Sequence, residues 1–310
     1  MILTVTLNSA VDQTWIVPDF RIHAIHRSRR VIRQPGGKGV NVARVLSALG
    51  INVCATGFVG GQNGRWMTKA LESDGIPSDF VWIGKETRTC LTLLDLDHGT
   101  QTEVLEPGPT VSEAEWKQLV AKVATWAEQS SFVACSGSLP PGVPENAYGE
   151  LIGVARSRGA AVWLDTSGKA LQHGWSARPD GIKVNQEEAG HLLGKVVSSR
   201  AETIAAARAL VRDIGQTVIV TAGSQGLAAV VGEETFWVTP PTVQAVNPVG
   251  SGDAFLAGWL AASHQKKSGE EALALATACA AANVLRETAG IEKQQVWALL
   301  KEVRVEKVID

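Results

Sequence analysis

The sequence has few of the features that mark a secreted, metal-binding or membrane protein. Its four cysteines lie far apart, with no CxxC pair and no histidine spacing typical of zinc sites, so we expect free thiols in a reducing compartment. The segment MILTVTLN lacks the charged region and cleavage site of a signal peptide, and the weakly polar run at 272–285 is too short to span a bilayer. These absences favour a soluble, cytoplasmic protein with no membrane partner.

The sequence also lacks an excess of charge of either sign. Its formal net charge is -2, which gives no basic field to attract a phosphate backbone, and this argues against nucleic acid as a partner. Small solutes are favoured instead. With 310 residues and 45% hydrophobic content, the chain can bury a large core.

Strand-like and helix-like segments alternate along the chain, without repeats. Such alternation predicts an α/β fold with a mostly parallel central sheet between helices, which places ligands at the carboxyl ends of its strands. Short apolar runs predict strands at 3–7, 53–58, 132–135, 161–164, 182–184 and 218–221. Apolar residues near 3.6 spacing predict helices at 40–49, 113–128, 146–158, 201–214, 254–264, 270–286 and 294–302.

Two segments interrupt this alternation. Residues of about 12–34 and 86–107 show polar alternation typical of strands and contain no helix between the strands. We therefore expect one domain over 1–310 that carries a small second sheet as a lid.

The stretch NPVGSGDAF at 247–255 combines glycines, an acid and the start of an apolar helix. Glycines at 250 and 252 around Ser251 allow backbone N–H groups to face an anion at a helix N-terminus. Asp253, in the first helical turn, is suited to accept the proton of an attacking hydroxyl. The alternative is an ordinary glycine turn with Asp253 as a helix cap.

A second glycine cluster, PGGKGVN at 35–41, opens another helix. It matches neither the order of a Walker A loop nor GxGxxG, because Val42 stands where the last glycine belongs. Its backbone donors, with Lys38 and Asn41, are suited to a polyhydroxy ligand or its phosphate. An ordinary strand-to-helix turn is the alternative.

Taken together, the motifs resemble those of pfkB-type sugar kinases of the ribokinase-like superfamily. TLNSAVD, GGKGVN, SGSLPPG, KVNQEE, TAGSQG and NPVGSGDAF follow one another in that family's order, nearly end to end. GGKGVN, ETRTC and TEVLEPGP are most similar to tagatose-6-phosphate kinases and related phosphofructokinases. The resemblance implies a three-layer α/β/α sandwich with a β lid, a homodimer through that lid, and ATP with Mg²⁺ as phosphoryl donor.

The resemblance also implies roles for individual residues. Asp253 corresponds to the catalytic base, and the anion hole corresponds to Gly250, Ser251 and Gly252. In the family, sugar hydroxyls are bound by residues that correspond to Asp12, Gly37 and Asn41. The phosphate already on the sugar is bound by residues that correspond to Lys38 and Arg88, and Ser138 lies beside them. The implied nucleotide side comprises Lys183, Asn185, Thr221, Gly223, Gly226 and Asn283. Asn185 and Glu188 correspond to a pair that organises magnesium through water.

Three functions compete at this point. The first is a kinase for tagatose 6-phosphate or fructose 6-phosphate, with fructose 1-phosphate as a variant, and Lys38 and Arg88 favour it because a neutral sugar would not need two cations. The second is a kinase for a neutral sugar or nucleoside. The third is a sugar-phosphate sensor without catalysis, against which the presence of Asp253 argues.

Overall fold

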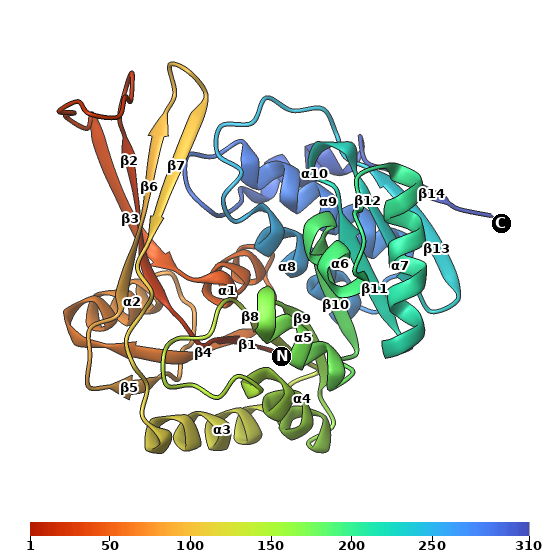
Figure 1. Cartoon of the computed structure of the whole chain (residues 1–310), viewed down its shortest axis with the longest axis horizontal. Helices are drawn as coiled ribbons and strands as arrows, with labels where there is room; N and C mark the ends of the chain where they lie inside the picture. The colour runs from red at the N-terminus through yellow and green to blue at the C-terminus, as the bar shows by residue number, and fades with distance from the viewer. Residues whose placement is uncertain (310) are drawn as a thin grey trace.

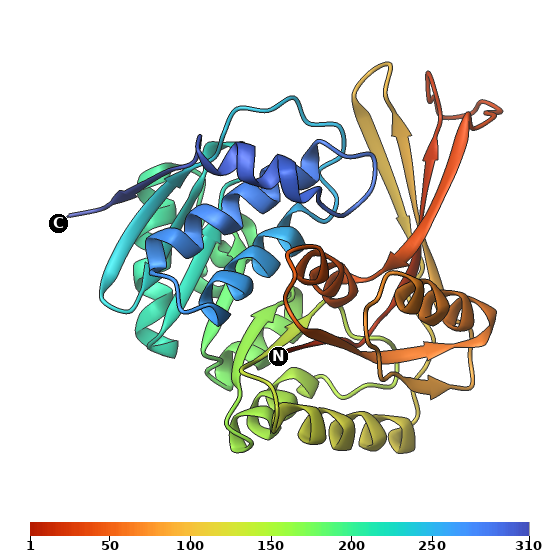
Figure 2. The same cartoon turned by 180° about the vertical axis from the view of Figure 1, so that it is seen from behind.

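The computed structural model describes residues 1–309, and its centre is a twisted sheet with helices on both faces (Figures 1 and 2). Within these residues the sheet has ten strands in the order β14-β13-β12-β11-β10-β9-β8-β1-β4-β5. The seven strands from β11 to β5 run parallel, whereas β12, β13 and β14 are antiparallel. Their bounds are β1 Ile2–Thr6, β4 Val53–Gly60, β5 Val81–Ile83, β8 Phe132–Ser136, β9 Ala161–Asp165, β10 Gly181–Asn185, β11 Thr217–Thr221, β12 Leu227–Val231, β13 Glu234–Thr239 and β14 Arg304–Lys307.

The helices form two layers, each with its own apolar core. One core lies under α1 (Lys38–Ala48), α2 (Gly61–Ser73), α8 (Ser251–His264), α9 (Gly269–Val284) and α10 (Lys293–Leu300). The other lies under α3 (Glu113–Ala127), α4 (Ala147–Ser157), α5 (Gly168–Ser176), α6 (Gln186–Leu193) and α7 (Arg200–Ile214). Because both faces are covered, the parallel strands are predominantly apolar, and every residue of β1 and β4 is buried, including Thr4, Thr6 and Thr56. The expected three-layer α/β/α architecture is confirmed.

A separate four-stranded sheet stands off the main body at one end (Figure 1). Its strands are β2 (Ala10–Ile16), β3 (Arg30–Gly36), β6 (Arg88–Asp95) and β7 (Thr100–Leu105), in the order β3-β2-β6-β7. β2 pairs antiparallel with β3 and parallel with β6, and β6 pairs antiparallel with β7. β6 and β7 fall within the expected segment 86–107, whereas β2 begins two residues before the expected segment 12–34 and β3 ends two residues after it. We call this sheet the lid sheet.

Several helices and strands were missed by the sequence patterns. α2, α5 and α6 were not predicted, nor were β5, the hairpin of β12 and β13, or β14. The helices that were predicted agree with the structure to within about three residues at each end. In residues 1–309, no helix combines the length and the apolar character that crossing a membrane requires.

Candidate active site

Two helix N-termini meet at the candidate base. α8 begins after Gly250, whose φ of 80° lies in the left-handed region, and α1 begins after Gly37, whose φ is 93°. Asp253 in the first turn of α8 is only 3% exposed. Its Oδ1 lies 2.8 Å from Nζ of Lys38, and its Oδ2 accepts a 2.9 Å hydrogen bond from Nδ2 of Asn41. Both carboxylate oxygens are therefore held by α1, and the carboxylate has a fixed orientation.

The ion pair continues into a buried chain of alternating charges. Nζ of Lys38 also lies 3.2 Å from Oδ2 of Asp165, the last residue of β9, and Nζ of Lys183 on β10 lies 3.2 Å from the same oxygen. Burial lowers the pKa of Lys38, but the carboxylates of Asp165 and Asp253 outweigh it and raise the pKa above its ordinary value. Burial raises the pKa of Asp165, but Lys183 and Lys38 hold it below its usual range.

Asp165 is a site residue that no motif indicated. The available signal is its position: an acid that ends the buried strand AVWLD, at the edge where parallel sheets bind ligands. Conversely, Lys38 was predicted to bind the phosphate on the sugar, but the structure shows a different geometry for its side chain. Its ammonium group is committed to Asp165 and Asp253, which places it beside the candidate base.

The glycine turn before α8 has fewer unpaired N–H donors than the sequence suggested. The N–H of Ser251 donates to the carbonyl oxygen of Pro248, so this donor is already used, which corrects the prediction for Ser251. Within residues 1–309, the N–H groups of Gly250, Gly252 and Asp253 make no hydrogen bond. Gly250 and Gly252 line the adjoining cavity, so unpaired donors stand at its wall, at the positive end of α8.

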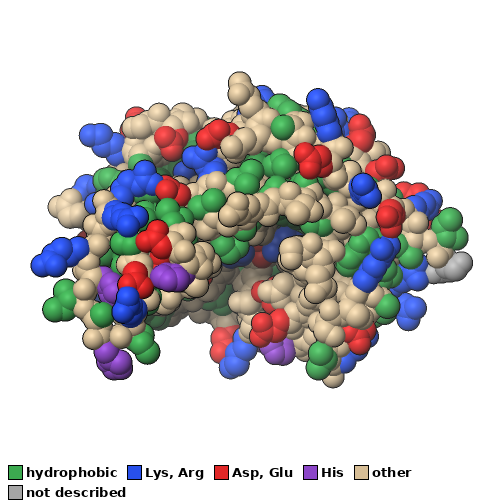
Figure 3. All heavy atoms as spheres, turned by 90° about the horizontal axis from the view of Figure 1, so that it is seen from above, with side chains coloured by type: hydrophobic (Ala, Val, Ile, Leu, Met, Phe, Trp, Pro, Cys, Tyr) green, Lys and Arg blue, Asp and Glu red, His purple; other side chains and the backbone are tan. Residues whose placement is uncertain are grey.

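A cavity of about 550 Å³ lies between the lid sheet and the carboxyl ends of the central strands. Seen from above, the molecule is hollowed near its centre, and charged side chains of both signs lie in the depth of the hollow (Figure 3). All the residues that the resemblance assigned to the sugar line this cavity, together with the candidate base: Asp12, Gly37, Lys38, Asn41, Arg88, Ser138 and Asp253. The structure thus brings segments from five parts of the chain together.

Asp12 is a half-buried carboxyl group in this cavity. Burial raises its pKa to about 7, against the opposing effect of the Arg88 guanidinium. Gly36 on the neighbouring strand β3 packs directly on the carboxyl group, and a Cβ at position 36 would collide with it. Gly36 therefore has a steric role, because the absence of a side chain at this position leaves room for the carboxyl group of Asp12.

Arg88 at the start of β6 is fixed by backbone carbonyl groups. Its Nε and Nη2 donate to the carbonyl oxygen of Asn8 at 3.2 and 3.0 Å, and its Nη1 donates to that of Glu106 at 2.8 Å. These bonds use three of the five N–H donors of a guanidinium group. The remaining two are available to a ligand. Nδ2 of Asn8 also donates to Oγ of Ser138 at 3.1 Å, which places Ser138 beside this cation.

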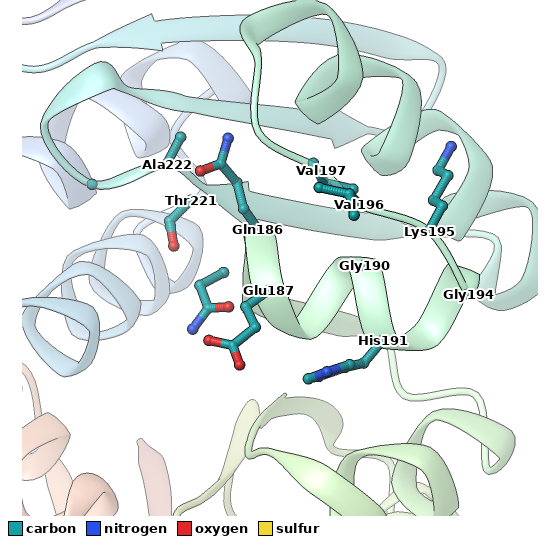
Figure 4. A pocket seen from close by; sticks show the side chains of 12 residues that line it. Gln186, Glu187, Gly190, His191, Gly194, Lys195, Val196, Val197, Thr221 and Ala222 are labelled. Carbon is teal, nitrogen blue, oxygen red and sulfur yellow. The ribbon is translucent and has the colours of Figure 1, made fainter.

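A second cavity, of about 910 Å³, runs along α6 (Figure 4). Three of the residues assigned to the nucleotide line it, namely Asn185, Thr221 and Gly223, whereas Glu188 lines the first cavity. Oδ1 of Asn185 accepts from the N–H of Glu188, and Oε2 of Glu188 accepts from the N–H of Asn185, both at 2.8 Å. The N-x-x-E pair is therefore the capping box of α6, at the junction of the two cavities.

Three further residues assigned to the nucleotide lie outside both cavity linings. Lys183 belongs to the buried charge chain, and Gly226, with φ of 125°, closes the turn before β12. Asn283 is 1% exposed, its Nδ2 donates to the carbonyl oxygen of Val249, and its Oδ1 accepts from the N–H of Gly290. These contacts give Asn283 a structural role in holding the turn before α8, and they provide no support for contact with adenine.

Comparison with known proteins places this architecture in a family. Residues 5–295 match the pfkB family of carbohydrate kinases. The chain belongs to this family. As a pfkB carbohydrate kinase, it is an ATP-dependent sugar kinase.

Solved structures similar to this pfkB kinase include phosphofructokinases. Phosphofructokinase-2 from Escherichia coli, in complex with substrates and products, is 28% identical with a TM-score of 0.92, over 97% of this chain and 98% of that one. A provisionally assigned 1-phosphofructokinase from Thermotoga maritima is 26% identical with a TM-score of 0.92, over 100% of both chains. A provisionally assigned phosphofructokinase from Staphylococcus aureus is 30% identical with a TM-score of 0.84, over 99% of both chains.

Proposed function

We propose that this kinase transfers the γ-phosphoryl group of ATP to a hydroxyl of a ketohexose phosphate, with tagatose 6-phosphate or fructose 6-phosphate as substrate and the bisphosphate and ADP as products. The observation that carries the proposal is that a held carboxylate, Asp253, and a fixed cation with unused donors, Arg88, line one cavity. The E. coli relative has been solved with fructose 6-phosphate, which supports a phosphorylated ketose.

In this proposal Asp253 is the general base. It accepts the proton of the attacking hydroxyl as that oxygen bonds to the γ-phosphorus and the bond from phosphorus to the oxygen of the ADP leaving group breaks. Lys38, which lies 2.8 Å from this carboxylate, stands where it can neutralise charge on the transferring group. The N–H groups of Gly250 and Gly252 add preorganised donors at the same place. Phosphoryl transfer depends mainly on such alignment and charge neutralisation.

The residues at the start of α6 fit an ATP-bound magnesium ion. Within residues 1–309 no group of three acidic, histidine or cysteine side chains is arranged to hold a metal, but Mg²⁺ is commonly held by one or two carboxylates, water and substrate phosphates. Burial raises the pKa of Glu188, and its Oε1 accepts no hydrogen bond within the described residues. Glu188, with Asn185 beside it, would hold the ion through water, and the ion would neutralise phosphate charge.

We also propose that the kinase forms a homodimer through the lid sheet. Trp15, Val31 and Val104 of this sheet are between 37% and 56% exposed, and the strand register places them on the same face of the sheet, which is unusual for large apolar side chains. Sedimentation equilibrium should give twice the chain mass, and charged substitutions at Val31 and Val104 should lower it. A wild-type protein that stays monomeric at micromolar concentration would contradict this proposal.

The substrate proposal is tested by kcat/KM for fructose, tagatose, their 6-phosphates and fructose 1-phosphate in an assay coupled to ADP release. We expect the 6-phosphates to be preferred over the free ketoses by about 10² or more, because a free ketose lacks the charge-assisted contacts that its phosphate would make with the cation in this site. Equal values for free and phosphorylated sugars would refute a phosphate-binding role for Arg88. The T. maritima relative makes fructose 1-phosphate the second candidate, and a preference for it would move the phosphate to the other end of the sugar.

A further inference from the structure

Gln34 is a cavity residue that none of the sequence motifs singled out. It lies on β3 directly opposite Asp12 on β2, so the two side chains leave the same face of the lid sheet with Cβ atoms about 5 Å apart. Both line the cavity of about 550 Å³, and Gln34 is only 8% exposed. A polar side chain buried to this degree is expected to have partners for both its carbonyl oxygen and its amino group.

Arg44 of α1 determines which end of the Gln34 amide enters the cavity. Nη2 of Arg44 donates to Oε1 of Gln34 at 3.1 Å. Because a guanidinium group carries donors and no acceptor, the atom that faces it must be the amide oxygen. The amino group of Gln34 therefore faces away from Arg44, and within residues 1–309 it donates to no acceptor. A donor with a fixed direction, to which no acceptor within residues 1–309 is bonded, thus lies at the cavity wall beside Asp12.

The same arginine is anchored on the opposite side of the cavity. Its Nη1 donates to the carbonyl oxygen of Ala289 at 3.1 Å. Ala289 packs closely on the turn before α8, because a Cβ added at Gly250 would lie 2.6 Å from the Cβ of Ala289. Arg44 therefore joins a strand of the lid sheet, through one planar group, to Ala289, which packs on the glycine turn.

We infer that Gln34 is a specificity-determining residue for the sugar, and this inference rests on the proposed function in that the sugar occupies this cavity. The amino group of Gln34 donates to one hydroxyl oxygen of the sugar, next to a hydroxyl that donates to Asp12. Arg44 is a positioning residue, because it acts through Gln34. A donor and an acceptor held side by side recognise two hydroxyls in one relative configuration, since inversion at either carbon leaves a buried group unpaired.

The experiment combines Gln34→Leu with deoxy sugars. Leucine removes the donor at similar volume, so KM for the sugar should rise about 3- to 10-fold, the value of one hydrogen bond to an uncharged hydroxyl, with no change in KM for ATP. Wild type and variant are then compared on the accepted ketose and its 3- and 4-deoxy analogues, which keep the acceptor hydroxyl and the phosphate. The penalty for removing the contacted hydroxyl should shrink in the variant by the same factor, while the other penalty stays as it is.

Two further variants separate this role from a structural one. Gln13→Leu is the matched control, because Gln13 lies on the same sheet next to Asp12 in sequence but does not line the cavity, and it should leave KM unchanged. Arg44→Lys keeps the charge and loses the planar fork, so it should raise KM for the sugar, and combining it with Gln34→Leu should add little further.

An unchanged KM in Gln34→Leu would overturn the assignment, as would deoxy penalties that are the same in both enzymes for both analogues. The failure of the proposed function has a different signature. The hydroxyls in question are present in free and phosphorylated ketoses alike, so a wild type that uses only free ketoses would remove the sugar-phosphate proposal and still allow the Gln34 comparison on those sugars.

Discussion

Replacing Asp165 by asparagine should show how much the buried charge chain contributes to stability and to turnover. The change keeps the shape of the side chain and leaves Lys38 and Lys183 facing a neutral amide, where both ammonium groups now lie 3.2 Å from a carboxylate oxygen. Lys183 is 7% exposed and has no other ion pair within the described residues, so its charge becomes uncompensated. Lys38 is 38% exposed and keeps Asp253, so its loss is smaller.

Breaking a buried ion pair by removing one partner costs about 3 to 5 kcal/mol, and the exposure of Lys38 argues for the lower end of this range. We therefore expect Asp165→Asn to lower the free energy of unfolding by about 3 kcal/mol, which corresponds to roughly 6 °C in Tm for a chain of this size. The pKa of Asp165 is held below its usual value of about 3.9, so this contribution is complete at neutral pH and is lost only as the pH falls through the depressed pKa.

The assay is thermal and urea unfolding near neutral pH, with Asp213→Asn as the matched control. Asp213 is exposed and makes no hydrogen bond or ion pair within residues 1–309, so its replacement should change stability by less than about 0.5 kcal/mol. Adding Lys183→Met to Asp165→Asn removes the uncompensated charge, and the two changes should then be non-additive by at least about 1 kcal/mol. An Asp165→Asn protein as stable as the control, or strictly additive effects, would refute the reasoning.

Three further predictions concern the cavity. Asp12 has a raised pKa of about 7, so its carboxyl group keeps a proton in the folded state at pH values where it has lost that proton in the unfolded state. The free energy of unfolding should therefore fall as the pH rises from about 4 to about 7. Asp12→Asn should flatten this slope when unfolding is measured as a function of pH. Gly252→Ala would place a Cβ 3.1 Å from Nζ of Lys183 and crowd the unpaired N–H groups, so kcat should fall by about 10² to 10³ with the fold intact by circular dichroism, and an unchanged kcat would make the turn purely structural. Arg88→Ala should raise KM for the ketohexose 6-phosphate by about tenfold or more, because the charge-assisted bonds from the two unused guanidinium donors to the phosphate are lost. KM for ATP should stay nearly unchanged. Equal effects on both substrates in steady-state kinetics would argue for a general disturbance of the structure.

The sequence was most informative where local chemistry and tertiary structure agree. The capping box of Ser112 and Glu115 starts α3, and short runs of apolar and β-branched residues mark strands such as β1, which is buried along its whole length because helices cover both faces. The missed helices have weak local signals. α2 carries Gly61 and Gly64 in its first turn, and burial of Met67 and Leu71 against the core stabilises it instead.

The candidate site shows the same division. Glycine turns and Asp253 could be recognised because their chemistry is local, and their order along the chain carried the resemblance. Which groups pair could not be read from the sequence, because ion pairs such as Lys38 with Asp165 join residues far apart in the chain. Ser251 and Asn283 illustrate the limit, since the hydrogen bonds that occupy them come from backbone groups that only the folded turn brings near.

The central claim is that Asp253 is the base of a phosphoryl transfer, and it is tested most directly by the single-turnover rate of Asp253→Asn at saturating ATP and sugar phosphate. Asparagine is nearly isosteric with aspartate, so the fold and the affinity for ATP should be kept, while the amide cannot accept the proton. The account predicts a rate lower by about 10² to 10⁴, the usual contribution of a positioned general base. A folded Asp253→Asn protein whose rate stays within about threefold of the wild type would contradict it.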